Sequence, residues 1–159
     1  MEKIRIDDLD SWQGPASVKR PLGQALGLMN AALNYYELAP GESFAFGYHR
    51  HEDQEEVFYI LEGTVTFETG DPEDPTTVAV KAGELIRFEP GEWQQGRNDG
   101  DERVRALALG APADSGETTI LRPCPDCGDQ TPQSVERADD ADALVTRCVE
   151  CRAETGRFD

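Results

Sequence analysis

The sequence is short of lysine, of histidine and of long apolar runs. Its 159 residues include three lysines and two histidines, and acidic residues outnumber basic ones 32 to 15, which gives a formal net charge of −17. Such a charge repels the phosphates of nucleic acids and anionic lipids, and no local basic patch offsets it. Binding to nucleic acid or to a membrane surface is therefore not expected.

The chain also lacks an apolar stretch long enough to cross a bilayer. Its first residues, Met1 to Arg5, do not form the apolar centre of a signal peptide, so we expect a cytoplasmic protein. The acidic residues are spread along the whole chain, and salt screens such dispersed charges over a few ångströms. We interpret the charge as a halophilic adaptation; attraction of a cationic partner is the alternative.

Short β-type runs separated by turn residues occupy the segment from about residue 31 to 110, and none has a helical period. The expected strands are Ala32 to Leu38, Ser43 to His51, Glu55 to Leu61, Thr64 to Thr69, Thr76 to Val80, Glu84 to Phe88, Trp93 to Arg97 and Arg103 to Leu109. Strands at this spacing predict an all-β barrel or sandwich. Upstream, Leu22 to Leu33 is apolar enough to lie along a barrel edge or to pair as a first strand.

The two histidines, His49 and His51, stand two residues apart, and Glu56 follows them. Side chains at positions i and i+2 of a strand project from the same face, so the two imidazoles can converge on one point. Two imidazoles and one carboxylate form an arrangement that suits Fe(II) and also accepts Mn, Zn, Ni or Cu. The alternative is a pair of surface histidines in an acidic loop.

These residues belong to a longer pattern that resembles the cupin family. The first cupin motif is matched by Pro40-Gly41, His49, His51, Glu56 and Gly63, although Gly41 to His49 is two residues longer than usual; Gly83, Pro90-Gly91 and Asn98 resemble the second motif. The resemblance implies a double-stranded β-helix, the jelly-roll barrel built from two sheets. It also implies a homodimer paired through those sheets.

Two positions in the motifs leave a choice of ligand. The third histidine of the cupin pattern is replaced by Gln94, whose carbonyl oxygen is a weaker and harder donor than imidazole. Gln94 is either a fourth ligand or stands off and leaves room for water or substrate. Strand alternation alone does not choose between Glu55 and Glu56, but the six-residue gap to Gly63 in the cupin pattern selects Glu56.

Aromatic and basic side chains near these motifs are further candidates. Seven aromatic residues are expected to form barrel core or a buried dimer face, with a substrate-stacking pocket as the alternative: Phe44, Phe46, Tyr48, Phe58, Phe67, Phe88 and Trp93. Four arginines are candidates for anchoring an anionic substrate, or else for ion pairs with the acidic surface: Arg87, Arg97, Arg103 and Arg105.

All four cysteines lie in two CxxC pairs, Cys124 with Cys127 and Cys148 with Cys151. In a reducing compartment such pairs favour metal over disulfide, and their separation of twenty residues is typical of a four-thiolate zinc site. We expect a small zinc ribbon that folds only with its metal, and a structural zinc, because four thiolates close the coordination shell. A redox dithiol is the alternative.

A change of composition at residues 110–116 predicts a linker. We therefore expect a barrel domain with an N-terminal extension at residues 1–112, and the linker and zinc ribbon at residues 113–159. Short strands are expected at Thr118 to Leu121, Val145 to Cys148 and Thr155 to Phe158. The segment from Glu117 has five arginines against ten acids, so contact with a protein or with the barrel is favoured over nucleic acid.

Two functions remain open at this stage. The first is a metal-binding cupin that binds a small molecule and acts as a metal-dependent enzyme, similar to a dioxygenase or an isomerase; the barrel metal would be Fe, Mn, Zn or Ni. The second is a non-catalytic sensor or adaptor whose zinc ribbon docks on a protein partner. The cupin fold alone does not choose between them, because one fold supports many functions.

Overall fold

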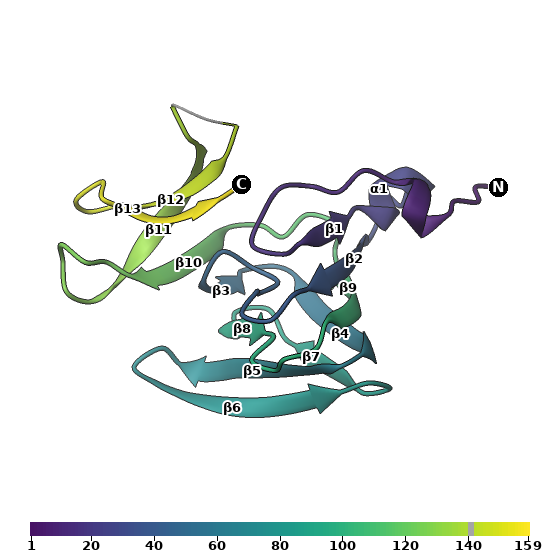
Figure 1. Cartoon of the computed structure of the whole chain (residues 1–159), viewed down its shortest axis with the longest axis horizontal. Coiled ribbons are helices and arrows are strands. Elements are labelled where there is room, and N and C mark those ends of the chain that lie inside the picture. The colour runs from purple at the N-terminus through teal and green to yellow at the C-terminus, as the bar shows by residue number, and fades with distance from the viewer. Residues whose placement is uncertain (140–141) are drawn as a thin grey trace.

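The computed structural model describes residues 1–139 and 142–159 and consists mainly of antiparallel strands (Figure 1). Its helical elements are the 3-10 helix η1 (Ile6–Asp8) and α1 (Leu22–Leu26). The strands are β1 (Val18–Arg20), β2 (Ala32–Leu38), β3 (Tyr48–His51), β4 (Glu55–Glu62), β5 (Thr64–Asp71), β6 (Asp74–Lys81), β7 (Leu85–Phe88), β8 (Gln94–Arg97), β9 (Val104–Ala111), β10 (Thr118–Pro123), β11 (Gln130–Arg137), β12 (Leu144–Cys148) and β13 (Glu154–Phe158). None of the described helices is long and apolar enough to cross a membrane.

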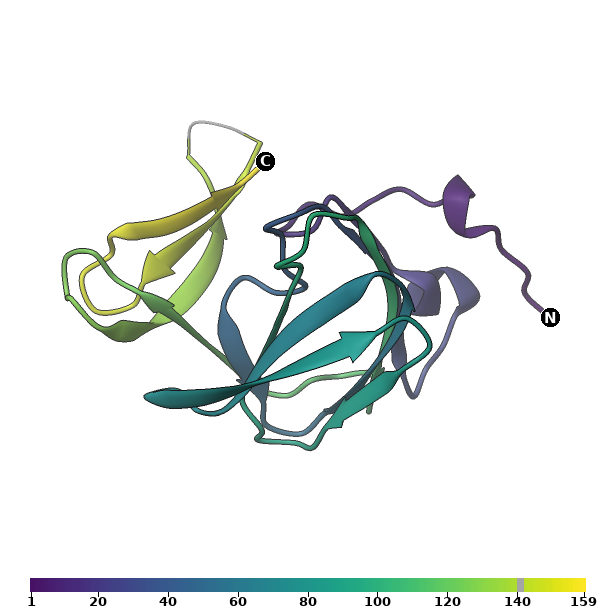
Figure 2. The same cartoon turned by 60° about the horizontal axis from the view of Figure 1, so that its bottom comes forward.

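The strands form two sheets. One has the order β1-β2-β9-β4-β7 and the other the order β13-β12-β11-β10-β3-β8-β5-β6. In Figures 1 and 2, strands β2 to β9 form one rolled body, and β11 to β13 extend from it. This is the jelly-roll arrangement that the strand pattern predicts.

The core lies between the two sheets, where strand alternation points every second side chain inward. On β4 these inward residues are Phe58 and Ile60, and on β5 they are Val65 and Phe67, all at most 2% exposed. Phe58 and Phe67 pack with their ring centroids 5.0 Å apart. Glu56 has the same parity as Phe58, so its carboxylate also faces the space between the sheets.

Most predicted strands are present, and the differences have local causes. The strand expected from Ser43 begins only at Tyr48, because residues 44–47 bend so that Gly47 packs against β10; a Cβ at position 47 would lie 2.5 Å from the backbone oxygen of Leu121. Of the two possibilities for Leu22 to Leu33, pairing as a strand was wrong for Leu22–Leu26, which form α1 and end at the left-handed Gly27, whereas α1 does lie against β2. Strand β11 was not predicted at all.

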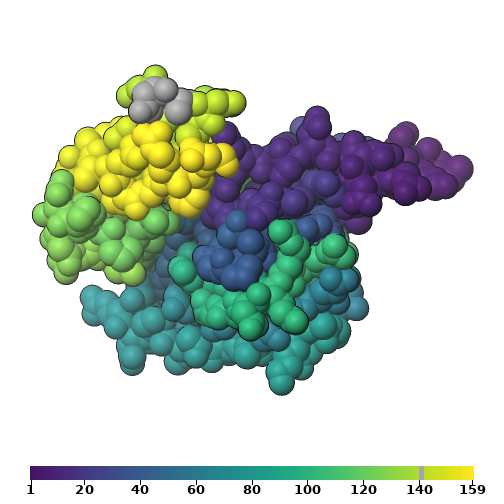
Figure 3. Space-filling view, in the orientation of Figure 1, coloured from purple at the N-terminus to yellow at the C-terminus, as the bar shows by residue number. Residues whose placement is uncertain are grey.

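The C-terminal strands are continuous with the barrel sheet. Strand β10 pairs with β3 on one side and with β11 on the other, so the sheet runs across the predicted boundary at residue 112. The rings of Phe46 and Phe158 also meet edge to face at 5.0 Å. In Figure 3 the N-terminal segment lies beside the C-terminal strands, and the Gln13 amide donates to the backbone oxygen of Asp142. The division into two domains stays a prediction.

Candidate metal centres

The side chains of His49, His51 and Glu56 converge in the space between the sheets. Oε2 of Glu56 lies 3.4 Å from Nε2 of His51 and 3.9 Å from Nε2 of His49, and the three potential ligand atoms lie within 4.8 Å of one another. Two donors at about 2.1 Å from the same ion are at most about 4.2 Å apart, which both carboxylate distances satisfy. The three side chains could therefore hold a metal ion.

The two sheets contribute different ligands to this cluster. The histidines come from β3 of the larger sheet, whereas Glu56 comes from β4 of the smaller one. The two imidazole centroids are 5.0 Å apart, as expected for residues two apart on one strand face. The cluster exists only because the two sheets face each other.

Hydrogen bonds fix the orientation of both imidazoles. Nδ1 of His49 lies 3.1 Å from the backbone oxygen of Gly47, which can only accept, so the proton is on Nδ1 and the lone pair on Nε2. Nδ1 of His51 lies 2.8 Å from the hydroxyl of Thr118, which can also accept. In metalloproteins such partners on the second ring nitrogen orient a histidine toward its metal.

The environment of Glu56 favours its ionised form. Burial by itself raises the pKa of this carboxyl, but hydrogen bonds from His49 and His51, and the positive charges of the two rings when they are protonated, outweigh burial and lower the pKa to about 2. An ionised carboxylate between two imidazoles is the state that a divalent cation requires. Glu55, in contrast, faces outward and pairs with Arg87 at 2.5 Å.

Gln94 is the first residue of β8 and pairs with His49 on the neighbouring strand β3. It is 2% exposed, and its amide nitrogen donates to Oε2 of Glu56 at 2.6 Å. Its carbonyl oxygen is buried and has no hydrogen-bond partner within the described chain. Gln94 thus contacts the carboxylate and retains one unused oxygen, which fits a site that accepts a further ligand.

A cavity of about 400 Å³ opens beside the cluster. Its polar lining residues besides the triad include Asn34, Gln54, Ser115 and Thr118, and its apolar lining includes Phe44, Phe46, Phe58 and Ile120. The volume lies within the usual range for small-molecule sites, about 300–1,000 Å³. The metal-binding atoms therefore face a space large enough for a small ligand.

Three functionally notable residues of the cavity are among those that were not identified from the sequence. Trp12, Lys19 and Tyr36 come from the N-terminal segment and β2. No motif marks them, because the N-terminal segment has little periodicity and matches no part of the cupin pattern. Only the pairing of Lys19 with Tyr36 in the β1-β2 register brings them to the cavity.

The four arginines considered as substrate anchors do not line this cavity. They form ion pairs on the outside of the barrel: Arg87 with Glu55 and Glu89, Arg97 with Asp99, Arg103 with Glu37, and Arg105 with Glu37 and Glu62. Their side chains are 43–51% exposed. The alternative interpretation, that acidic residues on the surface form ion pairs with these arginines, is confirmed.

The aromatic residues divide between the core and the outer face. Phe44, Phe58, Phe67 and Phe88 belong to the core, and Phe44, Phe46 and Phe58 also line the cavity. Tyr48 and Trp93 stack on the outer face with centroids 5.7 Å apart, and Arg50 lies over Trp93. The core interpretation therefore holds for most of them, and Phe44, Phe46 and Phe58 also fit the cavity alternative.

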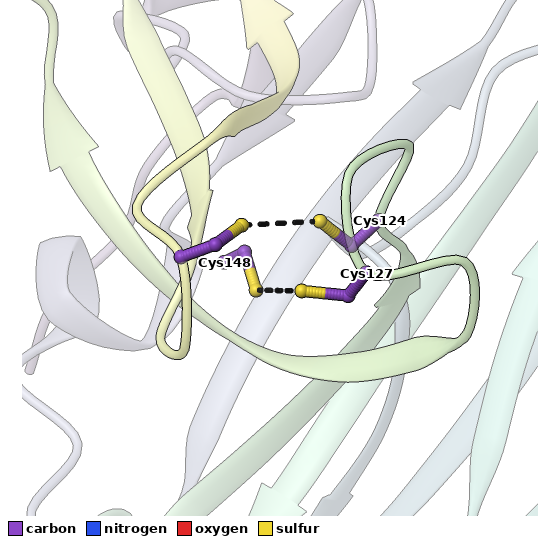
Figure 4. A group of neighbouring side chains, drawn as sticks. Cys124, Cys127 and Cys148 are labelled. Carbon is purple, nitrogen blue, oxygen red and sulfur yellow. Dashed lines mark hydrogen bonds between the residues drawn. The ribbon is translucent and has the colours of Figure 1, made fainter.

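The four cysteine side chains form a second cluster at the far end of the C-terminal strands. Cys124 and Cys127 point from one turn toward the facing turn that carries Cys148 (Figure 4). The sulfur of Cys124 lies 3.5 Å from that of Cys151, and the sulfur of Cys127 lies 3.9 Å from that of Cys148. Four thiolates around one tetrahedral zinc are about 3.8 Å apart, so this cluster could also hold a metal.

Both cysteine turns have the same backbone pattern. The amide of Gly128 donates to the carbonyl of Cys124, and the amide of Arg152 donates to the carbonyl of Cys148, each at 2.9 Å. Both residues have positive φ, +83° for Gly128 and +67° for Arg152. A positive φ is uncommon for a residue other than glycine. The guanidinium of Arg152 pairs with the carboxylate of Glu136 at 2.8 Å.

The surroundings shift the pKa values of the cysteine thiols in different directions. A hydrogen bond with the Thr131 hydroxyl, 3.2 Å away, and nearby backbone groups lower the pKa of Cys148 to about 6. The neighbouring sulfurs Cys151 and Cys124 raise the pKa of Cys127. Cys148 thus forms a thiolate readily. A bound cation is needed to balance the negative charge if the other three thiols are also to lose their protons.

Comparison with known proteins identifies the fold of the barrel. Residues 34–110 match the family profile described as a cupin domain. No curated protein matches the sequence closely enough to count as a relative. The matched region contains the triad, Gln94 and strands β3 to β8.

Several solved structures share the fold. A sugar phosphate isomerase from a cupin superfamily of Silicibacter pomeroyi is 20% identical and aligns over 97% of this chain and 92% of its own, with a TM-score of 0.59. The polyketide cyclase RemF of Streptomyces resistomycificus is 23% identical over 79% of this chain and 89% of its own, with a TM-score of 0.65. An oxalate decarboxylase of Lactobacillus farciminis is 17% identical over 72% of this chain and 34% of its own, with a TM-score of 0.59.

Proposed function

From a profile match and a shared fold that support a cupin family for this chain, we propose that its barrel binds a divalent transition metal and a small molecule together. His49, His51 and Glu56 hold the metal, with Gln94 as fourth donor or as support for the carboxylate. The observation that carries the proposal is the convergence of two oriented imidazoles and one ionised carboxylate on the edge of a cavity.

Three protein ligands leave coordination positions open, as catalytic metal sites do and structural sites do not. A divalent metal bound there supplies a Lewis acid that polarises an oxygen of the ligand, or a centre for oxygen chemistry. The described lining adds two groups that hold protons. Burial raises the pKa of Tyr36, so its hydroxyl is a neutral donor at neutral pH, and Lys19 adds an amino group whose pKa burial lowers and the charge of Glu56 partly restores.

These groups favour a metal-dependent enzyme of the dioxygenase or isomerase type over a passive metal site. The neighbours are named as an isomerase, a cyclase and a decarboxylase, so the fold does not select one reaction. The second candidate, a sensor or adaptor, is favoured by one observation: β10 connects the histidine strand to the cysteine-bearing strands. A ligand in the barrel would then be sensed by a partner docked on β11 to β13.

We assign the second cluster to a structural zinc ribbon that holds its ion with Cys124, Cys127, Cys148 and Cys151. Sulfur separations of 3.5 and 3.9 Å support this assignment. Salt adaptation of the acidic surface, a cytoplasmic location and a protein partner for the ribbon stay predictions.

Element analysis of purified protein tests the barrel site. Wild-type protein is expected to contain about one zinc for the cysteines and about one further divalent metal per chain. His51→Ala should lose the further metal and keep the zinc, because one ligand of three is removed. Arg50→Ala is the matched control, since its exposed side chain leaves the same strand on the opposite face and lies over Trp93. Equal metal content in wild type and His51→Ala would refute the barrel site.

A further inference from the structure

Lys19 places an ammonium group against the aromatic wall of the cavity. Its Nζ lies 5.7 Å from the ring centroid of Trp12 and 5.6 Å from that of Tyr36, both of which line the cavity with it. The position is fixed by the backbone: the amide of Trp12 donates to the oxygen of Lys19 at 2.7 Å, and Lys19 pairs with Tyr36 across β1 and β2. The backbone contacts of Lys19 thus hold its side chain in the lining of the cavity.

Among the described residues, this ammonium has no carboxylate within ion-pair distance. Within residues 1–139 and 142–159, no carboxylate lies within 4.0 Å of Nζ, and its described side-chain contacts are the two aromatic rings. Burial lowers the pKa of Lys19, and the charge of Glu56 partly opposes this. Largely buried charges are normally paired. In a chain with 32 acidic residues, a cation without a carboxylate beside it indicates that its anion comes from elsewhere.

We infer that the cavity binds a small organic carboxylate, whose anionic group pairs with Lys19 and whose apolar body lies against Phe44, Phe46 and Phe58. The inference rests on the proposed function, because the other end of the molecule then reaches the metal held by His49, His51 and Glu56. The ligand bridges the ammonium and the metal inside one cavity.

The charges of the cavity favour a carboxylate over a phosphate. Phosphate esters carry nearly two negative charges at neutral pH and are bound by several donors, often arginine or a helix N-terminus. The cavity lining contains Lys19 as its one lysine and no arginine in the described chain, and it also contains the negative Glu56. At the Lys19 end of the cavity a single ammonium matches a monoanionic group, while the charge of the metal acts on the other end of the ligand.

The aromatic part of the cavity lining favours an apolar, flat body for the ligand. Aromatic rings from Tyr36, Phe44, Phe46 and Phe58 line it, and Trp12, 47% exposed, lies at its edge. Aromatic faces pack well against planar apolar groups. An aromatic or unsaturated monocarboxylate of modest size is therefore the class that fits.

Titration calorimetry of the full, metal-loaded chain tests the inference with three matched probes: benzoate, neutral benzamide and phenyl phosphate. Benzoate is expected to bind at least tenfold more tightly than the other two, because only it presents a monoanion to the ammonium. Lys19→Met keeps the length of the side chain and should weaken benzoate binding at least tenfold. Lys19→Arg keeps the positive charge and should retain most of the affinity for benzoate. Lys81 is an exposed lysine on β6, and Lys81→Met should leave the affinity unchanged.

Three results would overturn the inference: no binding of benzoate to wild type, equal affinities for benzoate and benzamide, or unchanged affinity in Lys19→Met. Tighter binding of phenyl phosphate would assign the cavity to phosphate esters instead. The benzoate and benzamide comparison needs no Lys19 variant, and repeating it on His51→Ala protein, which should lack the barrel metal, separates binding to the ammonium from direct binding to that metal. Element analysis of the same sample separates the two proposals: benzoate binding that depends on Lys19 without barrel metal refutes only the metal site.

Discussion

The amide nitrogen of Gln94 donates a hydrogen bond of 2.6 Å to Oε2 of Glu56. This oxygen is also the one nearest to both imidazoles, at 3.4 Å from Nε2 of His51 and 3.9 Å from Nε2 of His49. Gln94 therefore orients the carboxylate, in the way that partners of metal ligands commonly do.

Replacing Gln94 by histidine should tighten metal binding in the barrel about tenfold or more, because an imidazole beside His49 is a stronger donor than an amide. Competition with a fluorescent chelator measures the affinity. Gln95→His is the control, since neighbouring residues on β8 point to opposite faces. Equal affinity of wild type and Gln94→His would mean that position 94 does not face the metal.

Cys127→Ser should release the zinc and unfold β11 to β13, because a small segment with one ligand missing loses the metal that stabilises it. Hydrogen exchange should show lost protection in these strands while β2 and β9 stay protected. Strand β3 pairs with β10, so its exchange should rise moderately. Val149→Ser, at an exposed position in the facing turn between Cys148 and Cys151, leaves all four thiols in place and serves as control. Loss of protection throughout the barrel would show that both parts share one folding unit.

Glu42 holds the N-terminal segment to the barrel, since its carboxylate accepts hydrogen bonds from the amides of Ser17 and Ala39, both at 2.7 Å. Partial burial opposes ionisation, but these bonds outweigh it and lower the pKa of Glu42 from its ordinary 4.5. Its stabilisation is therefore complete above pH 4.5 and is lost as the pH falls through the lower folded pKa. Glu42→Gln should reduce the free energy of unfolding by about 1 kcal/mol at pH 7.

Urea unfolding at several pH values measures this effect. The difference between wild type and Glu42→Gln should shrink as the pH falls below 4.5, whereas Glu73→Gln, an exposed acid in the turn between β5 and β6, should behave as wild type. A difference that does not change with pH would contradict the assignment.

The outer face of the five-stranded sheet carries exposed apolar side chains on neighbouring strands. Leu85 is 64% exposed beside Tyr59, and Leu109 is 39% exposed beside Val57. We expect two copies of the chain to pair through this face. Leu85→Lys should convert the dimer to a monomer in light scattering after gel filtration, while Val78→Lys on β6 of the other sheet should not. A monomeric wild type would refute the dimer.

Much of the site was predictable from local patterns. The spacing of His49 and His51 places both rings on one strand face, and the two CxxC pairs meet as their separation predicts. Turn residues likewise located most of the barrel strands. These features depend on residues close in the chain, where strand alternation and turn geometry leave few choices.

Contacts between distant segments could not be derived in that way. The opposing sheets bring Glu56 to the imidazoles, and the β3-β8 pairing brings Gln94 to Glu56. Lys19 reaches the cavity from a segment without any motif, and β10 joins the cysteine strands to the barrel. Alternation along one strand determines which of its side chains share a face. It does not determine which residues of another strand those side chains will contact. That choice depends on how the two sheets pack to bury their apolar sides, which is a property of the whole chain.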